Sequence, residues 1–235
     1  MNIALLGYGK MGKEIEAIAL KRNHTIVLKI NKENCDSITE TDFKKADVII
    51  EFSTPHAVLE NIKKCINAQV PVVIGTTGWY DNFEEIKKTC TDKNGSLFHA
   101  TNFSLGVNLF FKVNTYLAEL MNKYTNYDVS MEEIHHIHKL DKPSGTAITL
   151  AEQVISKIDR KTNWSIETKS TNTLFINDIR EGEVPGTHII KYSSEVDDIE
   201  IMHKAHNRKG FALGAVIAAE FLNGKKGIYT MSDII

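Results

Sequence analysis

The sequence predicts an α/β protein with a doubly wound parallel sheet in one domain and a mixed sheet in a second, α+β domain. Over the first hundred residues, short apolar segments alternate with helical patterns, as expected for parallel strands joined by helices. Beyond residue 125 the extended segments alternate polar and apolar residues instead. That alternation is typical of a sheet with one exposed or subunit-covered face.

The first domain is predicted to be discontinuous. Its five strands are expected at residues 2–6, 25–30, 47–52, 70–74 and 96–99, with helices between them. An apolar helix at 211–222 is expected to return and close this sheet. The predicted domains are therefore residues 1–106 with 210–235, which would bind a dinucleotide, and residues 107–209, which would bind the substrate and form the oligomer.

The second domain is predicted to begin with a long amphipathic helix over residues 107–124. Helical spacing places five apolar side chains on one face, which we expect to be buried: Leu109, Val113, Leu117, Leu120 and Tyr124. Strands are expected at 129–137, 186–194 and 198–205, and a loop with a short strand within 159–172. A further helix should start at Ser144, with a buried stripe of Ile148, Ala151, Ile155 and Ile158.

Composition and charge exclude several classes of protein. A net charge of -2 gives no electrostatic reason to expect nucleic acid or an anionic membrane as a partner. No apolar run approaches the roughly 20 residues that span a bilayer, and the start of the chain has no signal-peptide pattern. The three cysteines are widely spaced, which predicts reduced thiols and a cytoplasmic protein.

A glycine-rich turn directly follows the first predicted strand. Gly7-Tyr8-Gly9-Lys10-Met11-Gly12 has the G-x-G-x-x-G spacing of a dinucleotide-binding loop. Gly7 would permit the tight turn, Gly9 the approach of a pyrophosphate, and Gly12 close packing of helix on strand. A strand–helix turn without a ligand is the alternative. With the alternating strands, this loop predicts a Rossmann-like domain.

The end of the second strand bears on the choice of cofactor. NAD-preferring domains usually carry an acidic residue there, which accepts a hydrogen bond from the ribose. This chain has Asn31 and Lys32, and with Lys10 they would tolerate a 2′-phosphate. Glu33 could still reach a ribose if the strand is longer. The sequence therefore predicts NADPH, or both NADPH and NADH, rather than NADH alone, and it does not give the preference between the two.

Two other loops are expected beside the glycine loop. Gly75-Thr76-Thr77 and Ala100-Thr101-Asn102-Phe103 each follow a predicted strand, and they are rich in small and polar residues. The carboxyl ends of parallel strands share one edge of a sheet, where ligands bind. Ordinary βα turns are the alternative for each loop taken alone.

The densest group of chemically active residues lies at 135–147. His135, His136, His138 and Lys139 fall within five positions, and Pro143 and Ser144-Gly145-Thr146 follow. Histidine and lysine serve proton transfer near neutral pH. Ser144 is a candidate N-cap, so Gly145 and Thr146 would offer N–H groups and a hydroxyl to a carboxylate. A structural role, with the histidines capping a strand, is the alternative.

No metal site is predicted in this segment. Side chains alternate along a strand, so His135 should point away from His136 and His138. The two on one face could supply two ligands, but we identify no cysteine or carboxylate close in sequence that would complete the set.

The segment 135–147 closely resembles the signature of the 4-hydroxy-tetrahydrodipicolinate reductase family. These NAD(P)H-dependent enzymes reduce a cyclic dicarboxylate, with loss of water, in the diaminopimelate route to lysine. The resemblance covers essentially the whole chain. It includes the glycine loop, Gly75 to Thr77, residues 100–107, and the glycines and alanines at 210–215.

The resemblance implies a role for each matching residue. His135 corresponds to the family's proton donor and acceptor, and Lys139 to its proton-donating lysine. His136, Gly145 and Thr146 would hold the substrate's carboxylates. The dinucleotide would contact Gly7 to Gly12, Gly75 to Thr77 and Ala100 to Phe103. Family members are typically homotetramers joined through the sheet of the second domain, and no metal, membrane or nucleic acid is implied.

Two features depart from the family pattern, and two rival functions remain. The glycine loop is one residue shorter than many members have, and Asn31 stands where an acidic residue is frequent. Another two-domain dehydrogenase would share the first half of the chain but would not need the histidine–lysine segment. An inactive NAD(P)-sensing module would need the glycine loop alone. His138 receives no role, and the order of proton delivery by His135 and Lys139 is left open.

Overall fold

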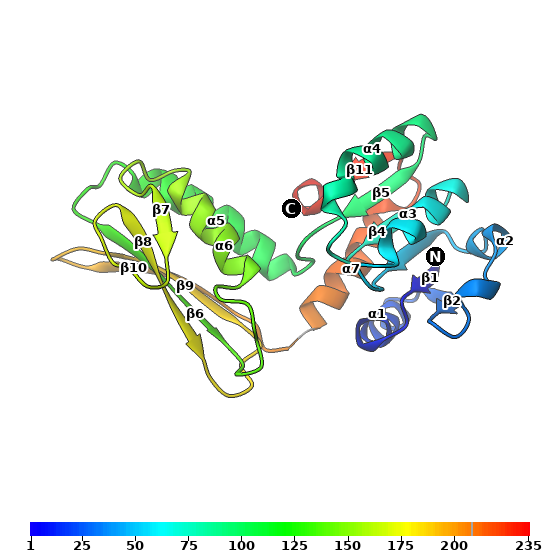
Figure 1. The fold of residues 1–235 in the computed structure, drawn as a ribbon, viewed down its shortest axis with the longest axis horizontal. Helices are drawn as coiled ribbons and strands as arrows, with labels where there is room; N and C mark the ends of the chain where they lie inside the picture. The colour runs from blue at the N-terminus through cyan, green and yellow to red at the C-terminus, as the bar shows by residue number, and fades with distance from the viewer. Residues whose placement is uncertain (208) are drawn as a thin grey trace. The chain divides into compact units, whose positions relative to one another are not determined.

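The computed structural model describes residues 1–207 and 209–235 and divides the chain into two compact units (Figure 1). Unit 1 comprises Met1–Leu105 with Lys209–Ile235, and unit 2 comprises Gly106–Arg208. The predicted end of the second domain adjoins residue 208, which lies outside the described residues.

Unit 1 is built on a six-stranded sheet in the order β11-β5-β4-β3-β1-β2, and every neighbouring pair is parallel. Its strands are β1 (Asn2–Leu6), β2 (Thr25–Ile30), β3 (Val48–Glu51), β4 (Val72–Ile74), β5 (Ser96–His99) and β11 (Gly227–Tyr229). The five predicted strands are confirmed. The sixth, β11, has only three residues and begins at a glycine, so it carries no detectable period.

Helices cover both faces of this sheet, which confirms the doubly wound architecture. One buried cluster contains residues of α2 (Glu40–Phe43), α3 (Val58–Asn67) and α4 (Phe83–Asp92), and the other contains residues of α1 (Lys10–Lys21) and α7 (Lys209–Leu222). Short 3-10 turns lie at Cys35–Ser37, Tyr80–Asn82 and Met231–Asp233. A Cβ atom on Gly214 would lie 1.7 Å from the carbonyl oxygen of Phe103, so only glycine lets α7 pack this closely.

Strand order locates the ligand edge of the sheet. The chain passes from β1 outward to β2 and then returns to β3 on the other side of β1. Such a reversal leaves a crevice at the carboxyl ends of the strands, where open α/β sheets bind ligands. The glycine loop, between β1 and α1, lies at this point.

Unit 2 contains a five-stranded mixed sheet in the order β10-β9-β6-β8-β7. Its strands are β6 (Asp128–His135), β7 (Asn163–Ser165), β8 (Thr173–Arg180), β9 (Thr187–Ser193) and β10 (Asp198–Lys204). The central strand β6 is parallel to β8 and antiparallel to β9, so the predicted mixed sheet is confirmed. Helices α5 (Leu105–Met121) and α6 (Gly145–Ile155) pack on one face, as Figure 1 shows.

The predicted buried face of the first long helix is wrong. Leu109, Val113 and Leu120 are each about half exposed, whereas Phe110 and Ala118 enter the core. The helix carries apolar side chains on more than one face, so periodicity alone could not select the face that meets the sheet. Asn114 is also buried, and its side-chain N–H donates to the carbonyl of Leu150 at 3.1 Å.

Two further expectations for unit 2 need correction. Strand β8 was not predicted, because Asn177, Asp178 and Arg180 interrupt its apolar pattern. Of the stripe predicted for the helix that starts at Ser144, Ala151 and Ile158 are buried, which confirms them. Ile148 and Ile155 are only partly buried, and the neighbouring Ala147 and Val154 enter the core in their place. Both misses concern residues that pack around β6, where the candidate catalytic residues lie.

Candidate functional site

The glycine loop of unit 1 combines a tight turn with open space. Gly7 has a φ of 102°, and a Cβ there would lie 2.0 Å from the carbonyl oxygen of Phe52. At Gly12 a Cβ would lie 2.6 Å from the carbonyl oxygen of Gly7, whereas a Cβ on Gly9 would meet no atom within 4 Å. Helix α1 begins immediately afterwards at Lys10. The loop thus presents backbone N–H groups and a helix N-terminus to an open position, which fits a phosphate.

Neighbouring side chains hold this loop against β2. The hydroxyl of Tyr8 donates to the carboxylate of Glu16. Lys29 Nζ lies 2.6 Å from the other oxygen of Glu16 and 5.0 Å from the centre of the Tyr8 ring. Beyond β2, Asn31 and Lys32 are exposed, and the Asn31 side chain accepts a hydrogen bond from the Glu33 N–H at 2.9 Å.

The loop after β4 is fitted closely to the end of β3. A Cβ on Gly75 would lie 2.0 Å from the Phe52 ring, so this position requires glycine. Thr76 is buried, and its hydroxyl accepts from the Ser53 N–H at 2.8 Å, while Thr77 is exposed. Beneath them lies the buried carboxyl of Glu51, whose pKa is raised by burial.

The loop after β5 has one residue that belongs to the core. Asn102 accepts a hydrogen bond from the Ser104 N–H at 2.9 Å, and Ala100 and Thr101 are at least partly exposed. Phe103 is only 2% exposed, and its ring centre lies 5.7 Å from that of Phe52. Its side chain therefore stabilises the unit, and its backbone is the part that lies at the sheet edge.

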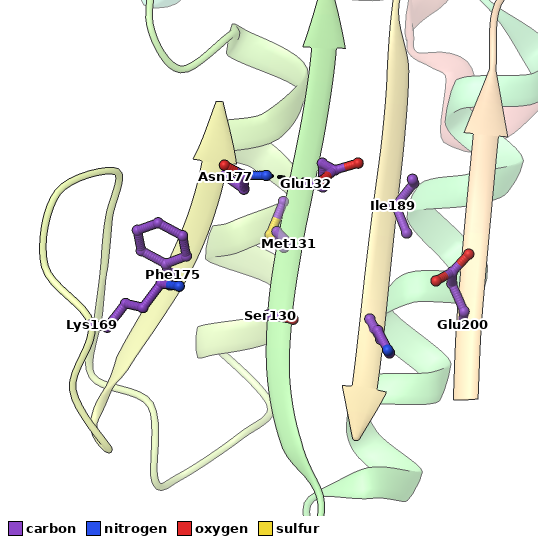
Figure 2. A pocket seen from close by; sticks show the side chains of 9 residues that line it. Ser130, Met131, Glu132, Lys169, Phe175, Asn177, Ile189 and Glu200 are labelled. Carbon is purple, nitrogen blue, oxygen red and sulfur yellow. Dashed lines mark hydrogen bonds between the residues drawn. The ribbon is translucent and has the colours of Figure 1, made fainter. Parts of the chain in front are cut away.

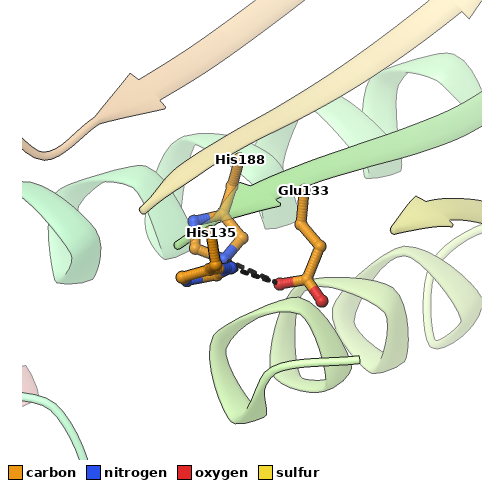
Figure 3. Close-up of side chains that lie close together, drawn as sticks. All are labelled: Glu133, His135 and His188. Atoms are coloured by element: carbon orange, nitrogen blue, oxygen red, sulfur yellow. Dashed lines mark ion pairs between the residues drawn. The ribbon is translucent and has the colours of Figure 1, made fainter. Parts of the chain in front are cut away.

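The second candidate site, in unit 2, is centred on a buried carboxylate (Figure 3). Glu133 and His135 share the covered face of β6, and Glu133 is paired in register with His188 of β9. His135 Nδ1 lies 3.1 Å and His188 Nε2 3.6 Å from Oε2 of Glu133. Each of the three side chains is less than a tenth exposed.

Opposing effects act on the pKa of Glu133. Burial alone would raise it, but contacts with His135, His188, Asp178 and Ser144 hold the pKa well below the usual range. The pKa of Asp178 is raised, by burial and by the neighbouring Glu133 carboxylate. Burial also lowers the pKa of His188, which favours its neutral form. The carboxylate charge therefore resides on Glu133.

A buried arginine fixes the segment that carries Lys139. Arg180 Nη2 lies 2.9 Å from Asp178 Oδ2 and donates to the Asp141 carbonyl at 2.7 Å. Arg180 Nε donates to the Lys139 carbonyl at 3.4 Å, and the Lys139 N–H closes a turn onto the His136 carbonyl at 3.1 Å. Lys139 Nζ lies 2.8 Å from Asp141. The backbone of the candidate catalytic lysine is thus tied to β8.

The start of α6 is tied to the same carboxylate. The Ser144 N–H donates to Glu133 Oε1 at 2.7 Å, and its hydroxyl accepts from the Ala147 N–H at 3.1 Å. The prediction of Ser144 as N-cap is confirmed. Gly145 and Thr146 are the first residues of the helix, and Gly145 is exposed.

The structure brings together residues that sequence reasoning separated or missed. Strand β6 ends at His135, so the expected alternation does not extend to His136 and His138. The expectation of no carboxylate close in sequence is wrong, because Glu133 precedes His135 by two positions and contacts it. The strand pattern could have revealed this contact, because Glu133 and His135 alternate onto the same buried face as Val129 and Met131. His138 is exposed and pairs with exposed Glu183 at 3.3 Å.

The three residues also have the composition of a metal-binding set. One donor atom from each of Glu133, His135 and His188 lies within 4.8 Å of the others. However, the Arg180 guanidinium lies 3.7 Å from the same carboxylate. A cation already neutralises Glu133 there, which favours an ion-paired network over a bound dication.

Comparison with known proteins places both units in one family. Residues 1–103 match the model of the dihydrodipicolinate reductase N-terminus, and residues 106–235 match that of its C-terminus. The chain belongs to the dihydrodipicolinate reductase family. A 4-hydroxy-tetrahydrodipicolinate reductase of Christiangramia forsetii is 47% identical over 235 residues, which is all of this chain and 98% of the relative. The enzyme of the same name from Neisseria meningitidis serogroup B is 34% identical over 94% of this chain and 83% of its own length.

Solved structures support the fold. A dipicolinate-bound dihydrodipicolinate reductase from Paenisporosarcina sp. TG-14 superposes with a TM-score of 0.81 at 23% identity, over 100% of this chain and 99% of that one. An amine dehydrogenase from Mycobacterium smegmatis reaches 0.55 at 9% identity, over 97% of this chain and 94% of that one. At so low an identity this second likeness concerns the fold alone. Within residues 1–207 and 209–235, no helix is both long and apolar enough to cross a membrane.

Proposed function

We infer that the chain reduces 4-hydroxy-tetrahydrodipicolinate to tetrahydrodipicolinate, with loss of water, at the expense of a reduced nicotinamide dinucleotide. This is a step of the diaminopimelate route to lysine. The observation that carries the inference is the match of the two family models along the chain, together with relatives of that activity over nearly their full length. Fold alone would not distinguish this reaction from those of other dehydrogenases.

The residues of unit 1 fit a dinucleotide. Gly9 leaves open space beside the N-terminus of α1, and a side chain at Gly7 or Gly12 would collide with backbone. We propose that Gly7 to Gly12 bind the pyrophosphate, and that Gly75 to Thr77 and Ala100 to Phe103 line the remainder of the crevice. A bound nicotinamide supplies the hydride for C4 of the substrate.

We propose that the residues of unit 2 supply protons and hold the substrate. His135 and Lys139 would donate the proton that the substrate needs as its 4-hydroxyl leaves as water. Gly145 and Thr146, at the start of α6, would bind a carboxylate with the help of the helix dipole. His136 would bind the other carboxylate from the end of β6.

We propose that both NADPH and NADH are accepted. The exposed Asn31 and Lys32 follow β2, where a 2′-phosphate would be bound. Neither repels a phosphate, and the neutral Asn31 does not demand a free ribose hydroxyl as a carboxylate would. Comparison of kcat/KM for the two cofactors measures the preference directly.

We propose a homotetramer assembled through the sheet of unit 2. Helices α5 and α6 cover one face of this sheet, and the opposite face is a shallow hollow of about 400 Å³ (Figure 2). Phe175 and Ile189 line it beside the charged Glu132, Lys191 and Glu200. Sedimentation equilibrium tests this, with Ile189→Glu expected to give smaller species. A wild-type monomer at assay concentrations would contradict it.

We also propose a cytoplasmic location. We propose further that the two parts of the chain bind different molecules, with residues 1–106 and 210–235 binding the cofactor and residues 107–209 binding the substrate. All three cysteines are unpaired, as expected for a reducing compartment. Cell fractionation tests the location. Separate titrations with cofactor and with dipicolinate, followed by chemical shifts in each unit, test the division.

The decisive experiment for the reaction is an assay of NADPH oxidation with freshly made substrate. The substrate is generated from pyruvate and aspartate semialdehyde by the preceding synthase. A fall in nicotinamide absorbance that requires both the synthase and this protein is expected. A flat trace with NADPH and with NADH, while either cofactor still binds, would instead favour an inactive sensor.

A further inference from the structure

We propose that Glu133 is a positioning residue for the reaction: it orients His135 so that Nδ1 is held by the carboxylate and Nε2 exchanges the proton, while Gly186 keeps Nε2 accessible. This rests on the proposed function in so far as His135 handles a proton. The orientation itself rests on geometry within unit 2.

The Nδ1 side of the ring is occupied. His135 Nδ1 lies 3.1 Å from Glu133 Oε2, and the Glu133 side chain is fully buried (Figure 3). A carboxylate beside one imidazole nitrogen favours the proton on that nitrogen and stabilises the imidazolium form. The other carboxylate oxygen accepts from the Ser144 N–H at 2.7 Å, which fixes the position of the carboxylate beside the ring. The Glu133 carboxylate therefore cannot easily move away from the His135 ring.

The Nε2 side of the ring faces a residue without a side chain. A Cβ on Gly186 would lie 3.0 Å from His135 Nε2, closer than ordinary carbon–nitrogen contacts. Gly186 has a φ of 150°, a conformation that favours glycine, and its carbonyl accepts from the Ala205 N–H at 2.8 Å. The backbone there is held in place, so a methyl group at 186 would cover the nitrogen rather than move aside.

Charged groups from several elements lie around the Glu133–His135 pair and its neighbours. Arg180 of β8 and His188 of β9 lie near Glu133, Asp178 of β8 pairs with Arg180 and Lys142, and Lys139 acts on His188. Arg180 is paired with Asp178 at 2.9 Å, and Lys142 lies 3.6 Å from the same aspartate. His188 is held near its neutral form by burial. Among the described residues, Glu133 is the charged side chain in direct contact with His135.

The arrangement gives a balanced proton step. Protonated His135 breaks its Nε2–H bond and passes the proton to the substrate, whose 4-hydroxyl departs as water. The neutral ring keeps its Nδ1–H on Glu133, and a solvent proton later restores Nε2–H. The proton consumed matches the one required by the overall reduction. Glu133 stabilises the charged ring before transfer and never changes protonation itself, in the manner of the aspartate in a catalytic triad.

Kinetics of Glu133→Gln provide the first test. We expect kcat to fall at least about tenfold, with the substrate KM changed less than about threefold, because the lost contact acts on proton transfer. The high-pH limb of kcat should move to lower pH, since the imidazolium loses its stabilising charge. Glu133→Asp, which retains the charge, should restore the limb at least in part.

The matched control is Glu132→Gln, on the neighbouring position of β6. Glu132 points to the opposite face and accepts from Asn177 Nδ2 at 2.8 Å. Its kcat and pH profile should stay close to wild type, once sedimentation shows the same assembly state. An active wild type with an unchanged Glu133→Gln profile would overturn the positioning role while leaving the proposed function intact.

An NMR measurement on the wild type tests the orientation without any assay. In protein labelled with 15N-histidine, the His135 resonance is assigned by its loss in His135→Asn. The neutral ring should carry its proton on Nδ1 in wild type, and this tautomer preference should be weaker in Glu133→Gln. A wild-type ring protonated on Nε2 would overturn the inference, whatever the assay shows about the reaction.

Discussion

The Ser144 N–H donates to Glu133 Oε1 at 2.7 Å, so one buried carboxylate joins the end of β6 to the start of α6. These are the elements that carry His135 and the proposed carboxylate-binding residues Gly145 and Thr146. Proton delivery and substrate binding are therefore built on one rigid junction. Its other members, His188 and the Asp178–Arg180 pair, come from the two strands that flank β6.

Ser144→Ala should weaken the start of α6, because it removes the hydroxyl and leaves the N–H that donates to Glu133. The hydroxyl caps α6 by accepting from Ala147, and loss of such a cap typically costs about 1 kcal/mol. We expect a decrease of that size in the free energy of unfolding and a raised KM for substrate, measured by urea denaturation and steady-state kinetics. Ser156→Ala, at the other end of the helix, is the control and should change stability by less than about 0.5 kcal/mol. Equal effects at both ends would contradict the role of Ser144.

His135→Ala and Lys139→Ala should each lower kcat by roughly a hundredfold or more, because each removes a proposed proton donor. NADPH binding should stay close to wild type, since the glycine loop lies in unit 1. Fluorescence titration and steady-state kinetics measure the two quantities. His138→Ala is the matched control, because His138 is exposed and its ion-pair partner, Glu183, is exposed as well. Wild-type turnover in both variants would refute the assignment.

Much of unit 1 could be predicted because its signals are local. A strand, a glycine turn and a helix follow one another in the sequence, and the parallel strands are continuous apolar runs. The strand and the α-helix of unit 1 that escaped prediction, β11 and α2, are three and four residues long, and the 3-10 turns are as short. Such short elements form because their neighbours hold them, so their own sequence carries little information.

The candidate site in unit 2 was only half predictable. His135, Lys139 and Ser144 lie close together in the chain, whereas His188 and Arg180 reach Glu133 only through the pairing of β9 and β8 with β6. Long-range pairing leaves no trace in one sequence. Polar residues such as Asp178 made β8 resemble a loop in sequence. They can be buried in a strand only when a partner compensates for the loss of water.

Gly186→Ala should impair catalysis through His135. The added methyl would lie 3.0 Å from Nε2, and alanine is strained at a φ of 150°. We expect kcat/KM to fall at least about tenfold, because the nitrogen that exchanges the proton is covered. Gly182→Ala separates backbone strain from the covering of Nε2. At Gly182 φ is 48°, which also strains alanine, but a Cβ would meet no atom within 4 Å. Similar losses in both variants would mean that backbone strain, and not access to Nε2, is responsible.

The pH dependence of the free energy of unfolding should show the effect of the buried Glu51 carboxyl in unit 1. Burial raises the pKa of this carboxyl above its value in the unfolded chain, so the folded state binds the proton more tightly. Stability contributed by the neutral form is present below the unfolded pKa of about 4.3, and is lost as pH rises through the folded value. Glu51→Gln keeps the shape and removes the charge, and should stabilise the protein at pH 8 by about 1 kcal/mol or more.

Urea denaturation of wild type and Glu51→Gln between pH 5 and 9 measures this effect, because the gain from the substitution should grow with pH. Glu84→Gln is the control: this exposed carboxylate, 3.7 Å from Lys87, should change stability by less than about 0.5 kcal/mol at every pH. Glu51 accepts from the Ser53 hydroxyl and from Asn61 Nδ2 at 3.2 Å, contacts that glutamine can retain through its own oxygen. A loss of stability that is constant across pH would therefore show that Glu51 is ionised in the folded protein, with its charge stabilised by these donors.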